Sequence, residues 1–223
     1  MLKPRKRLTK RQIKEDKLVT YYFTANEFLK QNSRLIGTGV FILIISVFVI
    51  FLYERNKQDK ENQATVQLTK ATAEYFQKNY ESTVKLLTNL EENLGGTKSA
   101  KVATYYLANS YYQLKKYKEA KKFFRKYLER GGDDILEASA LSGIAACYEE
   151  EGNYVEAAKT YKKAADKYSD GFMAPQNLYN AARCFALADN KEAASNLLSK
   201  LIEKYSNSNL KTPAEIFLAE LSI

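Results

Sequence analysis

The sequence repeats itself with a period of 37 residues over most of its length, so the chain is expected to fold as a stack of similar units. The clearest series is formed by small residues, namely Ala71, Ala108, Ala145, Ala182 and Ala219. Three other positions recur at the same spacing, and they hold Tyr80/Tyr117/Tyr154/Lys191, Thr83/Ala120/Ala157/Ala194 and Leu87/Phe124/Tyr161/Leu198. Four units therefore follow one another, and Thr212 to Ile223 is expected to form a solitary closing helix.

Each unit has the pattern of two antiparallel helices. Between Leu107 and Leu128, small and aromatic residues fall at helical spacing, with Ala108 where the two helices would cross and rings filling the space between them. Pro175 and Pro213 are expected to begin first helices, where a missing N–H costs nothing. The glycines expected to end second helices in a left-handed conformation are Gly95-Gly96, Gly131-Gly132 and Gly171.

The order of these residues, a Leu-Ala pair, a Tyr, a later Ala and an aromatic, resembles the tetratricopeptide repeat. The resemblance implies an all-α fold in which about four helix-turn-helix repeats form an α-solenoid with a C-terminal capping helix. The period of 37 differs from the 34 residues usual in that family, so the turns between units are expected to be longer.

Residues 35–53, LIGTGVFILIISVFVIFLY, contain no charged side chain. As a helix they would measure about 28 Å, close to the ~30 Å hydrocarbon thickness of a bilayer. A core helix of a soluble domain is the alternative, but residues 41–52 are apolar all round apart from Ser46 and leave no polar face for water. A cleaved signal peptide would not follow a charged tail of this length. We therefore predict a single transmembrane helix at 35–53, between a basic tail at 1–34 and a repeat domain at 54–223.

The two sides of this segment differ in charge. Residues 1–34 carry ten Lys/Arg and three Asp/Glu, a net charge of +7, whereas residues 54–223 carry 25 and 23, a net charge of +2. By the positive-inside rule the tail is cytoplasmic and the repeat domain lies across the membrane. The tail is expected to contain a short amphipathic helix and to contact anionic lipid through Lys3, Arg5, Lys6, Arg7, Lys10, Arg11, Lys14 and Lys17. The same charges would suit RNA or an acidic protein, although no nucleic-acid partner is expected.

The resemblance assigns the concave surface to the first helix of each unit. Counting along this sequence, the partner-binding groove is expected to be lined by Leu68, Thr72, Tyr75, Phe76, Tyr105, Asn109, Tyr112, Gln113, Glu149, Tyr179 and Arg183, with Val102, Ser142, Ala146, Glu150 and Gln176 beside them. Tyrosine supplies a large contact area at low cost in entropy, which favours a groove for a helix or peptide. Alternatively, rings such as Phe76 and Tyr105 pack between helices.

The composition argues against an enzyme. The chain has no His, the commonest general base and metal ligand, and no nucleotide-binding or hydrolase motif. Cys147 and Cys184 occupy equivalent positions in neighbouring first helices, whose axes pack about 8–10 Å apart, farther than a disulfide spans. We expect two small buried residues, no cofactor, no metal and no catalytic activity.

The layout of basic tail, single anchor and outer repeats resembles the ancillary subunit of the Sec translocon and related envelope proteins. This resemblance implies a single-pass protein of the bacterial inner membrane with its repeat domain in the periplasm. It also implies a scaffold for secretion or envelope assembly, with translocon subunits, periplasmic chaperones or exported chains as partners. One alternative is a constitutive structural subunit of a larger membrane complex, and self-association is also left open. Another is an import-type receptor with cytosolic repeats, which would require the opposite topology.

Overall fold

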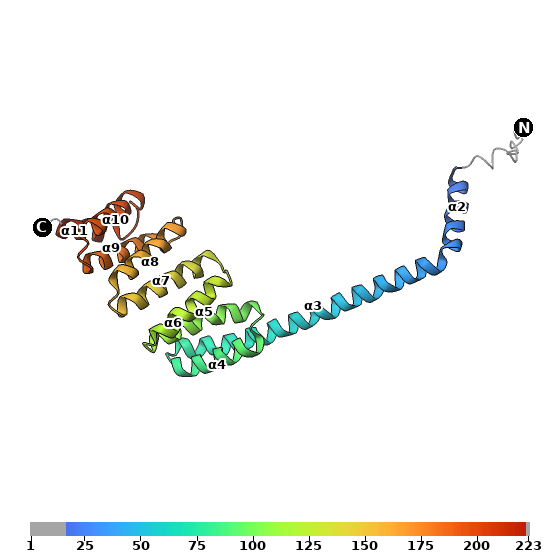
Figure 1. Ribbon diagram of the computed structural model, residues 1–223, viewed down its shortest axis with the longest axis horizontal. Helices are drawn as coiled ribbons and strands as arrows, with labels where there is room; N and C mark the ends of the chain where they lie inside the picture. The colour runs from blue at the N-terminus through green and yellow to red at the C-terminus, as the bar shows by residue number, and fades with distance from the viewer. Residues whose placement is uncertain (1–16, 222–223) are drawn as a thin grey trace, which may run out of the picture. The chain divides into compact units, whose positions relative to one another are not determined.

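The computed structural model describes residues 17–221, within which every regular element is a helix (Figure 1). This confirms the predicted all-α fold. The helices are α2 (Lys17–Gln31), α3 (Ser33–Phe76), α4 (Tyr80–Leu94), α5 (Lys98–Gln113), α6 (Tyr117–Glu129), α7 (Asp134–Glu150), α8 (Tyr154–Lys167), α9 (Ala174–Leu187), α10 (Lys191–Lys204) and α11 (Lys211–Leu221). The chain divides between Lys57 and Gln58 into two units, which are described separately.

The first unit holds α2 and the N-terminal part of α3. The apolar residues 35–53 belong to α3, and none of their side chains is buried. This helix is long and apolar enough to cross a membrane, judged by length and composition. Of the basic residues predicted to contact lipid, Lys17 opens α2 and is exposed. The others, Lys3, Arg5, Lys6, Arg7, Lys10, Arg11 and Lys14, lie outside the described residues.

The second unit is a series of helix pairs. Its first helices are the C-terminal part of α3, then α5, α7 and α9, its second helices are α4, α6, α8 and α10, and α11 comes last. From α4 onward, each helix packs on the next one in the sequence (Figure 1). The apolar segment and the first repeat helix lie in one unbroken helix, because no Gly or Pro interrupts α3 after Val40.

The recurring small residues lie in the core, as the period predicted. Ala71, Ala108, Ala145 and Ala182 are fully buried, and so are their second-helix counterparts Thr83, Ala120, Ala157 and Ala194. The fifth alanine departs from the series, because Ala219 is exposed. In the described chain no second helix follows α11, so the face of α11 that carries Ala219 has no second helix packed on it.

Four of the five left-handed residues in the described chain lie inside the units, at the turn between the first and the second helix. Lys78, Lys115, Gly152 and Asp189, again 37 residues apart, have φ values of 64°, 58°, 76° and 58°. Each ends a first helix with the paired hydrogen bonds of a Schellman motif. In the first unit, for example, Lys78 N–H donates to Tyr75 O and Asn79 N–H to Glu74 O.

The glycine prediction was therefore largely wrong. Gly131 is left-handed with φ 65°, but Gly95 is right-handed with φ −56°, and Gly96, Gly132 and Gly171 also lie outside the left-handed region. The short turn within a unit must reverse the chain at once, which requires the left-handed residue. The longer connection between units reverses over several residues.

Candidate functional site

The residues predicted to line a groove occupy four positions that recur every 37 residues on the first helices. These positions hold Leu68/Tyr105/Ser142/Tyr179, Thr72/Asn109/Ala146/Arg183, Tyr75/Tyr112/Glu149 and Phe76/Gln113/Glu150. Continued through the last first helix and α11, the same four positions reach Ala186, Leu187, Ile216 and Glu220. The structure brings some of these side chains together and leaves others apart.

A pocket of about 640 Å³ lies between α9 and α11, and we call it the C-terminal pocket. Its lining residues are Tyr179, Arg183, Ala186, Leu187, Pro213, Ile216, Phe217 and Glu220. Apart from Pro213 and Phe217, all of them fall at the four recurring groove positions, and Pro213 is equivalent to Gln176, which was expected beside the groove. Leu187 and Ile216 are exposed, and the ring centroids of Tyr179 and Phe217 are 6.0 Å apart. The predicted residues Tyr179 and Arg183 thus share an open, largely apolar hollow.

Sequence reasoning missed Leu187, Ile216 and Phe217. For the first two a signal existed, since each continues a recurring position by one more step of 37 residues. The series that leads to Ile216 ended too early because α11 was treated as a cap and not as a further first helix. Leu187 lies on α9, already identified as a first helix, and was simply left out. Phe217 gave no such signal in the groove series.

Other predicted aromatic residues form a cluster where α3 meets α5, which we call the N-terminal aromatic cluster. It consists of Tyr75, Phe76, Tyr105 and Tyr106. The Tyr106 ring centroid lies 5.4 Å from Tyr75, 6.4 Å from Phe76 and 5.7 Å from Tyr105. Phe76 remains 72% exposed, so packing between helices does not explain why a phenylalanine stands at this position.

Within this cluster, Tyr105 also has a structural role. Tyr105 contacts Phe124 and Tyr127 of α6, with ring centroids 6.0 and 5.7 Å away, as the alternative interpretation expected. Its carbonyl accepts a hydrogen bond from Asn109 Nδ2 at 3.0 Å. The Tyr105 ring therefore packs against α6, and the Asn109 side chain is bound to the backbone of its own helix.

Between these two regions lie polar groove residues that already have partners. Arg183 Nη1 is 2.6 Å from Glu149 Oε1, which joins α9 to α7 and raises the pKa of the Arg183 guanidinium. Glu149 Oε2 also accepts hydrogen bonds from Tyr161 Oη at 3.4 Å and Cys184 Sγ at 3.6 Å. The two opposite charges offset each other, so this part of the surface does not offer a lone charge to a ligand.

The other predicted groove residues are spread along the first helices. Burial, with the nearby Glu150 carboxylate, raises the pKa of Tyr112 to about 12, so this hydroxyl stays protonated. Gln113 is exposed, and Leu68 packs against the buried cluster around Ala71. Thr72 Oγ1 donates to the carbonyl of Leu68 at 3.0 Å.

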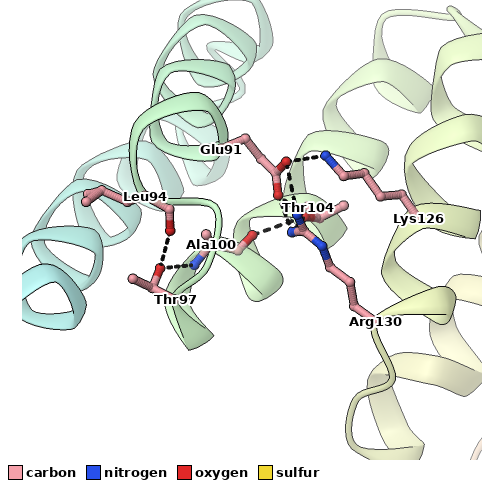
Figure 2. Close-up of polar contacts among 7 residues, drawn as sticks. All are labelled: Glu91, Leu94, Thr97, Ala100, Thr104, Lys126 and Arg130. Carbon is pink, nitrogen blue, oxygen red and sulfur yellow. Dashed lines mark hydrogen bonds and ion pairs between the residues drawn. The ribbon is translucent and has the colours of Figure 1, made fainter. Parts of the chain in front are cut away.

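A largely buried carboxylate, which the sequence analysis did not predict, holds the first two helix pairs together. The side chain of Glu91 on α4 is 8% exposed, and Figure 2 shows its carboxylate pointing towards Thr104, Lys126 and Arg130. It forms ion pairs with Lys126 and Arg130 and accepts a hydrogen bond from Thr104 Oγ1 at 2.7 Å. Burial acts to raise the pKa of Glu91. The hydrogen bonds from Lys126, Thr104 and Arg130 together outweigh this effect, so the pKa of Glu91 lies below its ordinary value.

The N-terminus of α5 is capped beside this network. Thr97 Oγ1 accepts a hydrogen bond from the Ala100 amide at 3.1 Å and donates to the Leu94 carbonyl at 2.8 Å (Figure 2). Lys126 of α6 and Arg130, the residue after α6, are thus bound to α4 within the fold.

The two thiols are unsuited to nucleophilic chemistry. Cys147 and Cys184 are free and buried. Burial raises the pKa of each to about 12, so the reactive thiolate is scarce at neutral pH. In the part of the chain that the structure describes, no three His, Cys, Asp or Glu residues are grouped to hold a metal ion.

Stacked helix pairs with an open hollow on the first-helix side define the protein as an α-helical repeat scaffold. The chain belongs to the family of tetratricopeptide repeat-like domains, whose model matches residues 26–176, and a second tetratricopeptide repeat model matches residues 176–208. Proteins of this family are generally non-catalytic scaffolds for protein–protein interaction.

Solved structures share the fold at low sequence identity. One is a set of nearly identical repeats from Podosopora anserina, described as kinesin light chain, with 14% identity over 72% of this chain and 86% of that chain, at a TM-score of 0.58. Another is RapI without ligand, with 16% identity over 69% of this chain and 45% of RapI, at a TM-score of 0.60. Comparison with curated proteins returned no match.

Proposed function

We propose that the protein is a membrane-anchored scaffold that holds a segment of another protein against its first helices. The observation that carries this proposal is the C-terminal pocket, which lies at the recurring positions expected to form a groove. Its volume of about 640 Å³ falls within the range of roughly 300–1,000 Å³ for binding pockets. An open pocket of this kind suits a partner side chain better than a small polar molecule.

The chemistry of the pocket favours an apolar segment as its occupant. Leu187 and Ile216 offer exposed aliphatic surface, while Tyr179 and Phe217 offer ring faces. The Arg183 charge is offset by Glu149, so an acidic anchor on the partner gains little. We infer that a short apolar helix or extended segment inserts one or two side chains here.

Anchoring at residues 35–53 would keep this scaffold at a membrane. The exposed, uncharged face of α3 supports a membrane-spanning role, and the net charge of +7 on residues 1–34 favours a cytoplasmic N-terminus. With the repeats on the periplasmic side, the partners would be translocon subunits, periplasmic chaperones or exported chains. The proposed role is therefore assistance in secretion or envelope assembly.

Site-specific crosslinking tests the groove. A photoreactive residue at Ile216, in the full chain in its native membrane, should capture translocon subunits, chaperones or a range of exported chains. Tyr179→Ala should reduce this capture, and the same probe at Lys163, exposed on the second helix α8, serves as the matched control. Equal capture from both probes would contradict a groove site. One stoichiometric partner would favour a constitutive structural subunit.

Anchoring and orientation have a separate test. Cysteines introduced at Lys17 and at Asn207, both exposed, should react with a membrane-impermeant maleimide from opposite sides of the membrane. The buried Cys147 and Cys184 should stay unlabelled in the folded protein. Extraction of the chain by alkaline carbonate would contradict a membrane-spanning helix, and labelling of Lys17→Cys from outside would invert the topology.

A further inference from the structure

A second cavity lies apart from the C-terminal pocket, and two exposed apolar side chains mark it. The cavity measures about 350 Å³ and lies between the start of α7 and the loop joining α8 to α9. We call it the loop pocket. Ile135 and Phe172, which both line it, are 57% and 74% exposed. Neither side chain is needed to fill the core.

These two residues are equivalent positions in successive units, since they are 37 residues apart. The same position holds Lys98 one unit earlier and Asn209 one unit later, both polar and exposed. An apolar residue at this position is therefore not a requirement of the repeat. The two exceptions lie on a single cavity, which distinguishes them from scattered exposed apolar residues.

A buried amide without a complete set of partners also lines the loop pocket. Asn177 of α9 is 1% exposed, and its Oδ1 accepts a hydrogen bond from Ser142 Oγ at 2.7 Å. Its Nδ2 has no hydrogen-bond partner. The equivalent residues of the two preceding units are Ala103 and Ala140, both fully buried. The fold thus accepts alanine here, whereas a buried donor left unpaired is destabilising.

The rim of the loop pocket is acidic. Asp134 and Asp170 are exposed at its edge. Lys167 also lines the pocket, but its charge is offset by Glu137, whose Oε2 lies 3.0 Å from Lys167 Nζ. A cationic group approaching this rim would meet two carboxylates, and an anionic lipid headgroup would be repelled.

From these three features we propose that the loop pocket binds an extended peptide segment in which an apolar side chain is followed by Lys or Arg. The apolar side chain contacts Ile135 and Phe172. A peptide carbonyl accepts a hydrogen bond from Asn177 Nδ2, since every residue of a peptide carries one such acceptor. The basic side chain lies between Asp134 and Asp170.

This site is separate from the groove of the proposed function. The C-terminal pocket is lined by α9 residues from Tyr179 onward and by α11, whereas the loop pocket is lined by the start of α7 and by the residues leading into α9. Only α9 contributes to both, through different residues. A variant of one pocket therefore leaves the lining of the other unchanged.

Fluorescence anisotropy with the full chain in detergent micelles tests the proposal. The probe is a fluorescein-labelled, C-amidated hexapeptide of sequence Gly-Ser-Leu-Lys-Ser-Gly, and the control peptides replace its Leu by Ser or its Lys by Glu. We expect saturable binding of the probe and at least tenfold weaker binding of either control. Asn177→Ala and Phe172→Ser should each weaken probe binding at least tenfold, whereas Tyr179→Ala should leave it unchanged.

Asn177→Ala is a favourable variant because alanine is the residue of the two preceding units. Its melting temperature should not fall, so lost binding would not reflect lost structure. If Asn177→Ala binds the probe as tightly as the parent chain, the proposal is wrong. It is also wrong if no peptide binds and Asn177→Ala melts lower, since Nδ2 then holds only a structural water. Dimerisation abolished by Phe172→Ser, without peptide binding, would overturn it in favour of a second copy.

Discussion

Glu91 and Asn177 are both polar side chains at positions that the other units fill with apolar residues, yet the fold treats them differently. The equivalents of Glu91 are Leu128, Ala165 and Ile202, and Asn177 replaces the alanines at 103 and 140. Glu91 has two cations and a hydroxyl around its carboxylate (Figure 2). Asn177 has one partner for its oxygen and none for its nitrogen.

A polar residue at a position that is apolar in the other units can therefore be interpreted from whether its hydrogen-bond partners are complete. A buried polar group whose partners are complete joins helices, as Glu91 joins α4 to α5 and α6, and its removal is expected to weaken the stack. A buried group whose partners are incomplete lowers stability, and its retention needs another explanation. Loss of Glu91 should therefore lower the free energy of unfolding, whereas loss of Asn177 should not.

The largest effect is expected for Glu91→Gln. Glutamine keeps the shape but loses the charge that Lys126 and Arg130 neutralise, so the free energy of unfolding should fall by about 2–3 kcal/mol. Urea unfolding followed by circular dichroism, with the full chain in detergent, would measure it. Glu92→Gln is the matched control, because Glu92 is the next residue of α4 and is exposed. Equal losses in the two variants would show that the network does not stabilise the fold.

Acid should weaken the junction of α7 and α8 in a defined pH range. Hydrogen bonds from the Tyr168 hydroxyl, Lys167 and the Gly132 amide hold the pKa of Glu137 at about 2, below the model-compound value of 4.5. A lowered carboxylate pKa stabilises the fold above pH 4.5, and this contribution is lost as the pH falls from 4.5 towards 2.

The corresponding variant isolates this residue from the other carboxylates. Glu137→Gln should lower the free energy of unfolding by about 1.5–2 kcal/mol at pH 7, and by progressively less as the pH falls below 4.5. Glu61, Glu91 and Asp166 also have lowered pKa values, so only the difference between parent and variant is informative. A difference that is constant from pH 7 to pH 2 would rule out this assignment.

A smaller effect is expected where α3 meets the start of α5. Glu61 accepts hydrogen bonds from the amides of Lys98 and Ser99, at 2.7 and 2.9 Å, and from Ser99 Oγ at 2.7 Å. It thus acts as an N-cap supplied by another helix. Glu61→Ala should cost about 1 kcal/mol in urea unfolding, whereas the exposed Asp59→Ala in the same helix should cost almost nothing. Similar values for both would mean that Thr97 alone caps α5.

The period of the sequence predicted the core because it reports which residues face a neighbouring helix in every unit. It located Ala71, Ala108, Ala145 and Ala182 correctly, but it failed at Ala219, where burial depends on a helix that the described chain does not supply. None of the four left-handed turn residues inside the units was predicted: Lys78, Lys115 and Asp189 lack the signal of glycine, and Gly152 was not among the glycines expected to end a helix.

The polar features could be predicted only in part. Comparison of units marks Glu91 and Asn177 as exceptions from the sequence alone, but their partners come from other helices, and only the structure shows which are within reach. Glu91 meets Lys126 and Arg130 because α4 and α6 both pack on α5. The absence of a partner for Asn177 Nδ2 likewise depends on how α7 and α9 face each other.

The last effect, no larger than that of Glu61→Ala, is expected for the contact between Ser142 and Asn177, and it is best measured as a double-mutant cycle. Ser142→Ala removes the donor to Asn177 Oδ1, so both polar atoms of the amide are left unpaired and the free energy of unfolding should fall by about 1 kcal/mol. In an Asn177→Ala background the same change should cost much less, because no buried amide remains. The cycle therefore predicts a coupling energy of about 1 kcal/mol between the two residues. If the Ser142→Ala penalty were the same in both backgrounds, the two side chains would not be coupled. Asn177 would then cease to be the counterpart of Glu91 at a unit junction, because its oxygen would gain nothing measurable from Ser142.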